Sequence, residues 1–176
     1  MHLSPLKLDN YYFTEVRISC QSDSTDEESD QYDFEVDTDA TLERPDQPRV
    51  WFVFLTITIN GQQNKTPRFT GEIGLMGKFT VDDGWAADRI EELVYINGSG
   101  LLYAAAREMI CSITGRTFFE ALTIPSWSFG TMYKEFKQQQ KQIIEKQAQL
   151  SLQPPANPAG TVGEPTPKPA DPPNAP

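Results

Sequence analysis

The residues that could carry out chemistry are few and poorly placed for it. His2 is the only histidine in the 176 residues, and it lies at the N-terminus, where the chain is expected to fray. We therefore expect no histidine inside the domain to act as a general base or zinc ligand. The acidic run from Asp23 to Asp30 is not a calcium loop, because an EF-hand needs Gly at its sixth position, where Glu28 stands. We expect a solvated, mobile acidic loop over residues 21–30.

The glycines Gly71, Gly74 and Gly77 could suggest a loop that cradles phosphate. A dinucleotide-binding fingerprint, however, continues directly into a helix, whereas the residues after Gly77 have the pattern of a strand. No motif singles out a pair of carboxylates for acid–base catalysis among the acidic residues. We therefore expect a protein that is not an enzyme and that has no cofactor and no metal site.

The composition excludes two further classes of function. The formal net charge is −10 and the isoelectric point is near 4.5, without the clustered Lys and Arg that bind phosphate backbones. We expect no nucleic-acid partner, since an acidic surface suits basic or unfolded polypeptides. No stretch reaches the roughly 20 apolar residues that span a bilayer, and the N-terminus lacks the apolar run of a signal peptide. We expect a cytoplasmic protein without stable membrane insertion.

The first half of the chain has the patterns of β-strands. A short strand is expected at Phe34 and Val36, and the segment bracketed by Pro45 and Pro48 is expected to form a crossover loop. Residues 50–60 are rich in β-branched and aromatic side chains, and Asn60–Gly61 predicts a tight hairpin turn before a return strand over about residues 66–81. A long half-buried strand is expected over residues 6–19, with these apolar side chains on one parity: Leu6, Leu8, Tyr12, Val16 and Ile18.

The second half has helical spacing and then a tail. We expect a short helix over residues 85–94, a break near Asn97 with Ser99 as a cap, a helix ending near Thr114, and a final helix from about Ser128. Residues 151–176 are rich in Pro and poor in apolar residues, so we expect a disordered tail after a domain of residues 1–150. Strands followed by helices predict an α+β fold with the helices on one sheet face.

Three segments, in the same order along the chain, resemble the SecB family of protein-export chaperones. Residues 95–118 resemble the main helix of that family, with an aromatic-Ala-Arg-Glu step at Tyr103–Glu108 and a Thr-Phe end. Residues 69–79 resemble its last strand, and residues 122–129 resemble its Leu-x-x-Pro-x-x-Phe linker. The resemblance implies a four-stranded antiparallel Greek-key sheet with helices on one face, and a homotetramer built as a dimer of dimers.

The resemblance also implies where partners bind. Members of the family hold unfolded clients in grooves between the crossover loop and the helices, and they dock on the translocase ATPase SecA through an acidic sheet face. Glu15 and Glu72 are the expected SecA-docking residues, and Gly71, Ile73 and Leu75 stand at positions that resemble an oligomer interface. The expected client-binding residues come from the loop side and the helix side: Phe34, Val36, Leu42, Leu122, Ile124, Trp127, Phe129, Met132, Tyr133 and Phe136.

The function that the resemblance implies is that of a holdase, a molecular chaperone that binds unfolded polypeptides, here preproteins for Sec-dependent export. Ser19 and Thr70 replace an acidic and an apolar residue at the docking face, which leaves open a SecB-like chaperone dedicated to one client, such as an antitoxin. A non-chaperone adaptor that uses the same fold, with residues 153–176 as its binding segment, is a third possibility.

Overall fold

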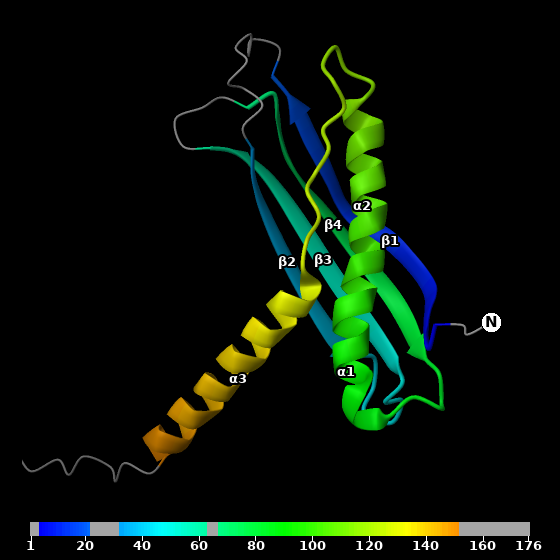
Figure 1. The fold of residues 1–176 in the computed structure, drawn as a ribbon, viewed down its shortest axis with the longest axis vertical. Helices are drawn as coiled ribbons and strands as arrows, with labels where there is room; N and C mark the ends of the chain where they lie inside the picture. The colour runs from blue at the N-terminus through cyan, green and yellow to red at the C-terminus, as the bar shows by residue number, and fades with distance from the viewer. Residues whose placement is uncertain (1–3, 22–31, 63–66, 152–176) are drawn as a thin grey trace, which may run out of the picture. The chain divides into compact units, whose positions relative to one another are not determined.

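The structure is a computed structural model that describes residues 4–21, 32–62 and 67–151. Four strands, β1 (Leu6–Cys20), β2 (Tyr32–Leu42), β3 (Val50–Gly61) and β4 (Phe69–Val81), form one antiparallel sheet in the order β1-β4-β3-β2 (Figure 1). Three consecutive strands are neighbours and β1 returns to lie beside β4, which is a Greek-key arrangement. The predicted four-stranded Greek-key sheet is confirmed.

Strand β1 does not keep the single parity that its apolar residues suggest. Its register against β4 shifts twice, at Asp9 and at Thr14, and each extra residue turns the following side chains to the other face. Between these bulges Tyr12 lies on the open face, 49% exposed, and its hydroxyl donates to Met76 Sδ at 3.4 Å. Phe13 instead packs against the core. The expected placement of Tyr12 on the buried face is wrong for this reason.

The connection between β3 and β4 also differs from the expectation. Asn60 and Gly61 do not form a tight turn, because they extend β3 and pair with Asp33 and Tyr32 of β2. The connection comes after them, at residues 62–68, of which 63–66 are outside the described residues. A neighbouring strand that is long enough to pair with a turn-prone dipeptide can hold it in the ladder.

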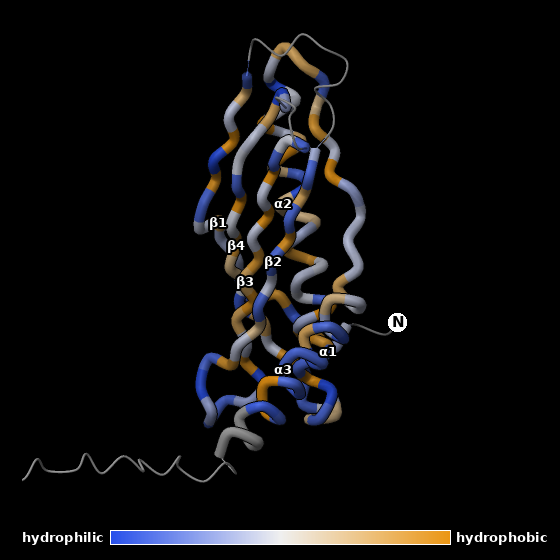
Figure 2. Tube along the Cα trace, turned by 90° about the vertical axis from the view of Figure 1, so that its left-hand side faces the viewer, coloured by the Kyte–Doolittle hydropathy of each residue, from blue (hydrophilic) through white to orange (hydrophobic). Residues whose placement is uncertain are grey.

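The helical segment from Ala87 to Thr114 lies against one side of the sheet (Figures 1 and 2). A 3-10 turn (Ala87–Arg89), α1 (Ile90–Leu93), a π-helical turn (Val94–Gly98) and α2 (Ser99–Thr114) follow one another without a break. The expected cap at Ser99 is wrong, because Gly98 already has helical dihedrals, with φ −63° and ψ −48°. The Ser99 hydroxyl is buried and shares a 2.7 Å hydrogen bond with the Thr38 hydroxyl.

Helix α3 (Phe129–Ser151) begins at the predicted place. The chain divides after Gln138 into two compact units, so that the first turns of α3 belong to the unit that contains the sheet and the rest belongs to the second unit. Residues 22–31 and 152–176 lie outside the described residues, and with them most of the expected acidic loop and almost all of the expected tail. The mobile loop and the disordered tail stay predictions.

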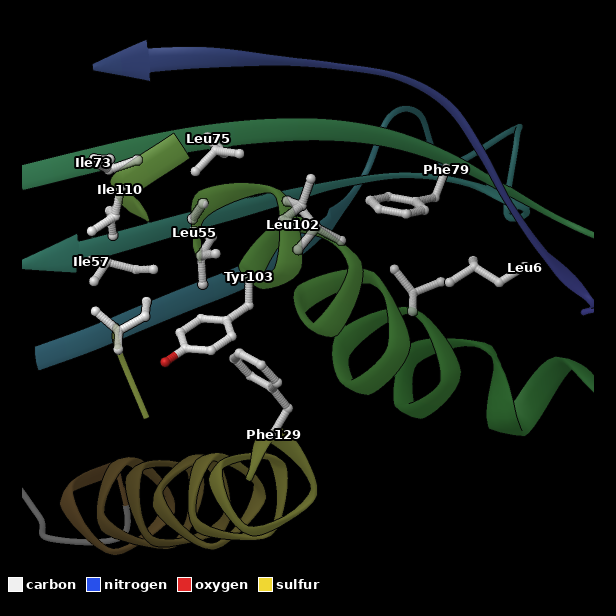
Figure 3. Packing of buried hydrophobic residues seen from close by; sticks show 14 of the residues in the cluster. Leu6, Leu55, Ile57, Ile73, Leu75, Phe79, Leu102, Tyr103, Ile110 and Phe129 are labelled. Atoms are coloured by element: carbon white, nitrogen blue, oxygen red, sulfur yellow. The ribbon is translucent and has the colours of Figure 1, made fainter. Parts of the chain in front are cut away.

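The core fills the space between the sheet and α2 (Figure 3). Odd-numbered side chains of β3 and β4 point to this space, as the alternation of buried and half-buried residues along both strands shows. Gly98 lets the chain approach the sheet closely, since a Cβ there would lie 3.0 Å from a methyl group of Val53. The largest side chains that are almost wholly buried include Leu55, Ile57, Ile59, Phe69, Ile73, Leu75, Phe79, Leu102 and Ile110.

Candidate functional site

The site is built around the linker of residues 115–128, which connects α2 to α3. Two hydroxyl groups of α2 hold this linker in place. Thr114 Oγ1 accepts the Leu122 N–H at 2.9 Å and donates to the Ile110 carbonyl at 2.8 Å. The Tyr103 hydroxyl donates to the Pro125 carbonyl at 2.5 Å. The linker is thereby fixed as a wall rather than left as a free loop.

A pocket of about 560 Å³ lies where the linker faces the ends of β2 and β4. Tyr32 and Phe34, two residues apart on β2, place their rings 5.8 Å apart on this side. The Arg68 guanidinium lies 5.0 Å from the centre of the Phe119 ring. The pocket thus combines aromatic and aliphatic walls with a few polar groups, and it is lined by Tyr32, Phe34, Gln62, Arg68, Phe69, Glu120, Ala121, Leu122, Thr123 and Pro125.

The three client-binding residues expected on the loop side do not gather at one place. Phe34 lines the pocket together with Leu122 of the linker. Val36 follows on the same face of β2 and is partly buried against the core. Leu42, at the other end of the strand, is 39% exposed. The structure therefore brings only Phe34 of these three to the pocket.

Three of the residues expected on the helix side belong to the core. Leu122 is 8%, Ile124 2% and Phe129 6% exposed. Phe129 packs edge-to-face on Tyr103 of α2, with ring centres 5.6 Å apart (Figure 3). The packing of the linker and of the start of α3 explains why Leu122, Ile124 and Phe129 are apolar. Of these three residues, only Leu122 also lines the pocket.

The remaining helix-side residues attach the first turns of α3. Trp127 is partly buried, and its indole N–H donates to Met132 Sδ at 2.8 Å. Tyr133 and Phe136 place their rings 5.3 and 5.5 Å from that of Tyr95, in the π-helical turn. One step further along α3, Lys137 Nζ donates to both carboxylate oxygens of Glu91, each at 2.7 Å.

Acidic side chains and Lys137 surround this aromatic cluster. Burial raises the pKa of the Tyr95 hydroxyl, and the carboxylates of Asp37 and Asp39 raise it further. Burial likewise raises the pKa of Tyr133, to which Glu91 adds in the same direction. Both hydroxyl groups are therefore neutral donors at physiological pH.

The two expected SecA-docking residues lie close together on the open face of the sheet. Arg17 stands between them, since its Nη2 lies 2.9 Å from Glu72 Oε2 and 3.3 Å from Glu15 Oε1. This arginine offsets part of the negative charge that a basic partner would meet. No local pattern in the sequence indicates this bridge.

The residues expected at an oligomer interface occupy an interior strand. Ile73 and Leu75 are buried, at 0% and 1% exposure, under the helices of the same chain. Gly71 lies against β1, where a Cβ would come 2.0 Å from the Arg17 carbonyl oxygen. Gly71 is half-buried, and the expected interface role of the three residues stays a prediction.

Several residues of the pocket were missed by sequence reasoning. Tyr32 lies two residues from Phe34 and thus on the same face of β2, and this spacing is the sequence signal that could have identified it. Arg68 and Glu120 have no local pattern that distinguishes them from other surface charges. Phe118, in the linker next to Phe119, is 106% exposed. These residues come together only because the linker turns back along the sheet.

Two tests for other kinds of site were negative within the described residues. No group of three or more His, Cys, Asp or Glu side chains there could hold a metal ion. None of the helices in that part of the chain is long and apolar enough to cross a membrane.

Comparisons with known proteins identify the family. A family model described as preprotein translocase subunit SecB matches residues 6–141. The protein-export proteins SecB of Legionella pneumophila strains Corby and Lens are each 30% identical over 115 residues, which cover 65% of this chain and 66% of the relative, just under two thirds of its length. A SecB-like chaperone of Mycobacterium tuberculosis, solved with a ChAD peptide from an antitoxin, superposes with a TM-score of 0.50 at 15% identity, covering 70% of this chain and 91% of that one. With the fold confirmed and the family model matching most of its length, the chain belongs to the SecB family.

Proposed function

We propose that the chain is a holdase chaperone that binds unfolded polypeptides at the pocket between β2 and the linker and catalyses no reaction. The observation that carries this proposal is the pocket itself, where the apolar side chains of Phe34 and Leu122 lie beside polar groups such as the Arg68 guanidinium. Unfolded segments expose apolar side chains together with backbone N–H and C=O groups, and a pocket that combines apolar and polar walls can accept both. Phe34 and Leu122 form its walls, whereas Ile124 and Phe129 act by positioning the linker.

Exposed apolar residues beside the pocket support the same proposal. Phe118, which precedes Phe119 in the linker, is wholly exposed. Phe118 precedes Glu120, which lines the pocket, by two residues, so its ring is accessible to a client segment that leaves the pocket. We propose that Phe118 and Leu42 contact client segments that extend beyond the pocket, and that Val36, Trp127, Met132, Tyr133 and Phe136 border their path.

The clients that we propose are preproteins for Sec-dependent export, met in the cytoplasm. The description of the family model and the names of the Legionella pneumophila relatives support this choice. The narrower alternative is a single dedicated client such as an antitoxin, as in the complex of the Mycobacterium tuberculosis chaperone. A panel of unrelated unfolded proteins separates the two, because an export chaperone protects several and a dedicated one protects its own client alone.

We further propose that SecA is a partner and that it meets Glu15 and Glu72 on the open sheet face. Because Arg17 already pairs with both carboxylates, a basic partner has to compete with it. Arg17→Gln should therefore strengthen binding of SecA, whereas binding that is unchanged in this variant would place the docking surface elsewhere. We also propose that the chain assembles as a homotetramer. Native mass spectrometry of the full chain tests this proposal.

Suppression of aggregation tests the chaperone proposal. An unfolded client is diluted from denaturant and light scattering is followed at equimolar protein. Phe34→Ala should reduce the protection, and the matched variant Phe54→Ala should not, because Phe54 lies on the open face of β3 at 39% exposure and away from the pocket. A wild-type chain that leaves the scattering unchanged would refute the proposal.

A further inference from the structure

Tyr95 is buried apart from the main core. It lies in the π-helical turn (Val94–Gly98) and is 3% exposed, directly after the wholly buried Val94. Val94 belongs to the hydrophobic cluster between the sheet and α2, whereas Tyr95 does not. π-Helical turns are rare within helices and often occur at functional positions. The contacts that bury Tyr95 therefore need a different explanation from the packing of the core.

On one side, the π-helical turn is attached to β2. The Tyr95 hydroxyl donates to the Thr38 carbonyl oxygen at 3.5 Å. The Thr38 hydroxyl donates to the Phe54 carbonyl oxygen at 2.9 Å and shares a 2.7 Å hydrogen bond with the Ser99 hydroxyl, just after the turn. Because Thr38, Tyr95 and Ser99 are buried, these hydrogen bonds are costly to break. Thr38 lies four residues beyond Phe34, which lines the pocket from the same strand.

On the other side, Tyr95 is attached to α3. The rings of Tyr133 and Phe136 lie 5.3 and 5.5 Å from the Tyr95 ring, and the Phe136 ring is nearly parallel to it, at 23°. The Lys137 ammonium lies 5.7 and 5.9 Å from the centres of the Tyr133 and Phe136 rings. It also forms the ion pair with Glu91, four residues before Tyr95. Because α3 directly continues the linker, these contacts restrain the linker as well.

Tyr95 therefore joins the two walls of the pocket from outside it. One wall is β2, which carries Phe34 and, further along, the Thr38 carbonyl group that Tyr95 contacts. The other wall is the linker, which carries Leu122 and leads into α3. Tyr95 itself does not line the pocket. A connection between two walls limits how far they can separate, even when it lies outside the space that they enclose.

We propose that Tyr95 is a positioning residue for client binding, which holds the linker wall at a fixed distance from the β2 wall and thereby slows the release of a bound client. The proposal rests on the chaperone function proposed above and adds a residue to it. Tyr95 acts through its neighbours, because its ring holds α3 while its hydroxyl and that of Ser99 hold β2. A pocket with fixed walls has no ordering cost when it binds, and differences in affinity between related complexes lie mostly in the release rate.

Stopped-flow fluorescence tests the proposal on the full chain. The client is fluorescein-labelled α-lactalbumin that has been reduced and carboxymethylated, so that it stays unfolded without denaturant. Tyr95→Leu removes the contacts with two rings, each worth a factor of about two to ten in the attachment of α3. The client should be released about tenfold faster, while its association rate should change by less than about twofold. Tyr95→Phe keeps the ring and should release the client at a rate within about threefold of the wild type.

Hydrogen exchange measures the attachment of α3 directly. In Tyr95→Leu, the amides of Thr131 and Met132, which donate to the Ser128 carbonyl oxygen, should exchange about tenfold faster through local opening of the helix. If circular dichroism shows that Tyr95→Leu is unfolded, Tyr95→Met takes its place with the same expected results, because methionine fills the space without a ring.

The control variant is Leu6→Ala. It removes a buried side chain at the start of β1, the sheet edge opposite β2, and should lower the free energy of unfolding. The client release rate and the exchange of the Thr131 and Met132 amides should nevertheless stay within about twofold of the wild type, because these amides exchange by local opening. Leu6→Ala thus separates a loss of stability from a loss of positioning.

Four results would overturn the positioning role. They are release from Tyr95→Leu at the wild-type rate, equally fast release from Leu6→Ala, release from Tyr95→Phe as fast as from Tyr95→Leu, and fast release with unchanged exchange in α3. If the wild type still binds the client and suppresses aggregation in these cases, the chaperone function stands and only the role of Tyr95 fails. If the wild type binds no client and suppresses no aggregation, the chaperone proposal has failed together with this one.

Discussion

Replacement of Gly71 by Ala tests how closely β1 approaches β4. An added Cβ would lie 2.0 Å from the Arg17 carbonyl oxygen and 2.9 Å from Ile18 Cα, and both of these are backbone atoms that cannot rotate away. The strands would have to separate by about 1 Å, which breaks roughly two hydrogen bonds at about 1 kcal/mol each and adds about 1–2 kcal/mol of strain. We expect Gly71→Ala to lower the free energy of unfolding by about 3–4 kcal/mol.

Urea unfolding followed by circular dichroism measures this loss. With an m-value of about 2 kcal/mol/M, the midpoint should fall by about 1.5–2 M. The matched control is Gly100→Ala in α2, where no atom lies within 4 Å of the added Cβ and the helix should gain about 0.5–1 kcal/mol. A loss below 1 kcal/mol for Gly71→Ala would refute the reasoning. A loss that depends on protein concentration would instead place Gly71 in a contact between copies.

Three further predictions concern the groups that hold the linker and α3. Thr114→Val removes the acceptor of the Leu122 N–H and should cost about 1–3 kcal/mol, with faster hydrogen exchange at that amide. Burial raises the pKa of Tyr103 above its unfolded value near 10. The contribution of this hydroxyl to the free energy of unfolding should therefore be fully present below pH 10 and be lost as the pH rises through the folded-state pKa. In Tyr103→Phe, urea unfolding at about pH 9 and 11 should show a smaller fall. Lys137→Met breaks the half-exposed pair with Glu91, and it should cost only about 0.5 kcal/mol while hydrogen exchange in the first turns of α3 becomes faster.

Periodicity predicted the strands and helices well because the core lies on only one face of the sheet. The odd-numbered residues of β3 and β4 face α2, so their alternation appears directly in the sequence. The bulges in β1 were not predictable, because an extra residue at Asp9 or Thr14 is defined only against the register of β4. Asn60–Gly61 failed as a turn signal for a similar reason, since pairing with β2 holds it in the ladder.

The site was harder to predict than the fold. An apolar residue in a linker has the same pattern whether it fills the core, as Ile124 does, or lines a pocket, as Leu122 does. The distinction depends on where the Thr114 and Tyr103 hydroxyl groups attach the linker, which no local spacing reveals. Of the ten residues expected from the family resemblance, the structure places Phe34 and Leu122 at the pocket, and their role in client binding stays a prediction.

Photo-crosslinking of an unfolded client tests the central claim most directly. A photoreactive amino acid replaces Ala121, which is exposed and lines the pocket, or Thr41, which is exposed on the open face of β2. The account predicts strong crosslinks from position 121 to the unfolded client, few from position 41, and few from either position to the same client when folded. Crosslinks that are equally strong from both positions, or no more frequent for the unfolded client than for the folded one, would contradict it.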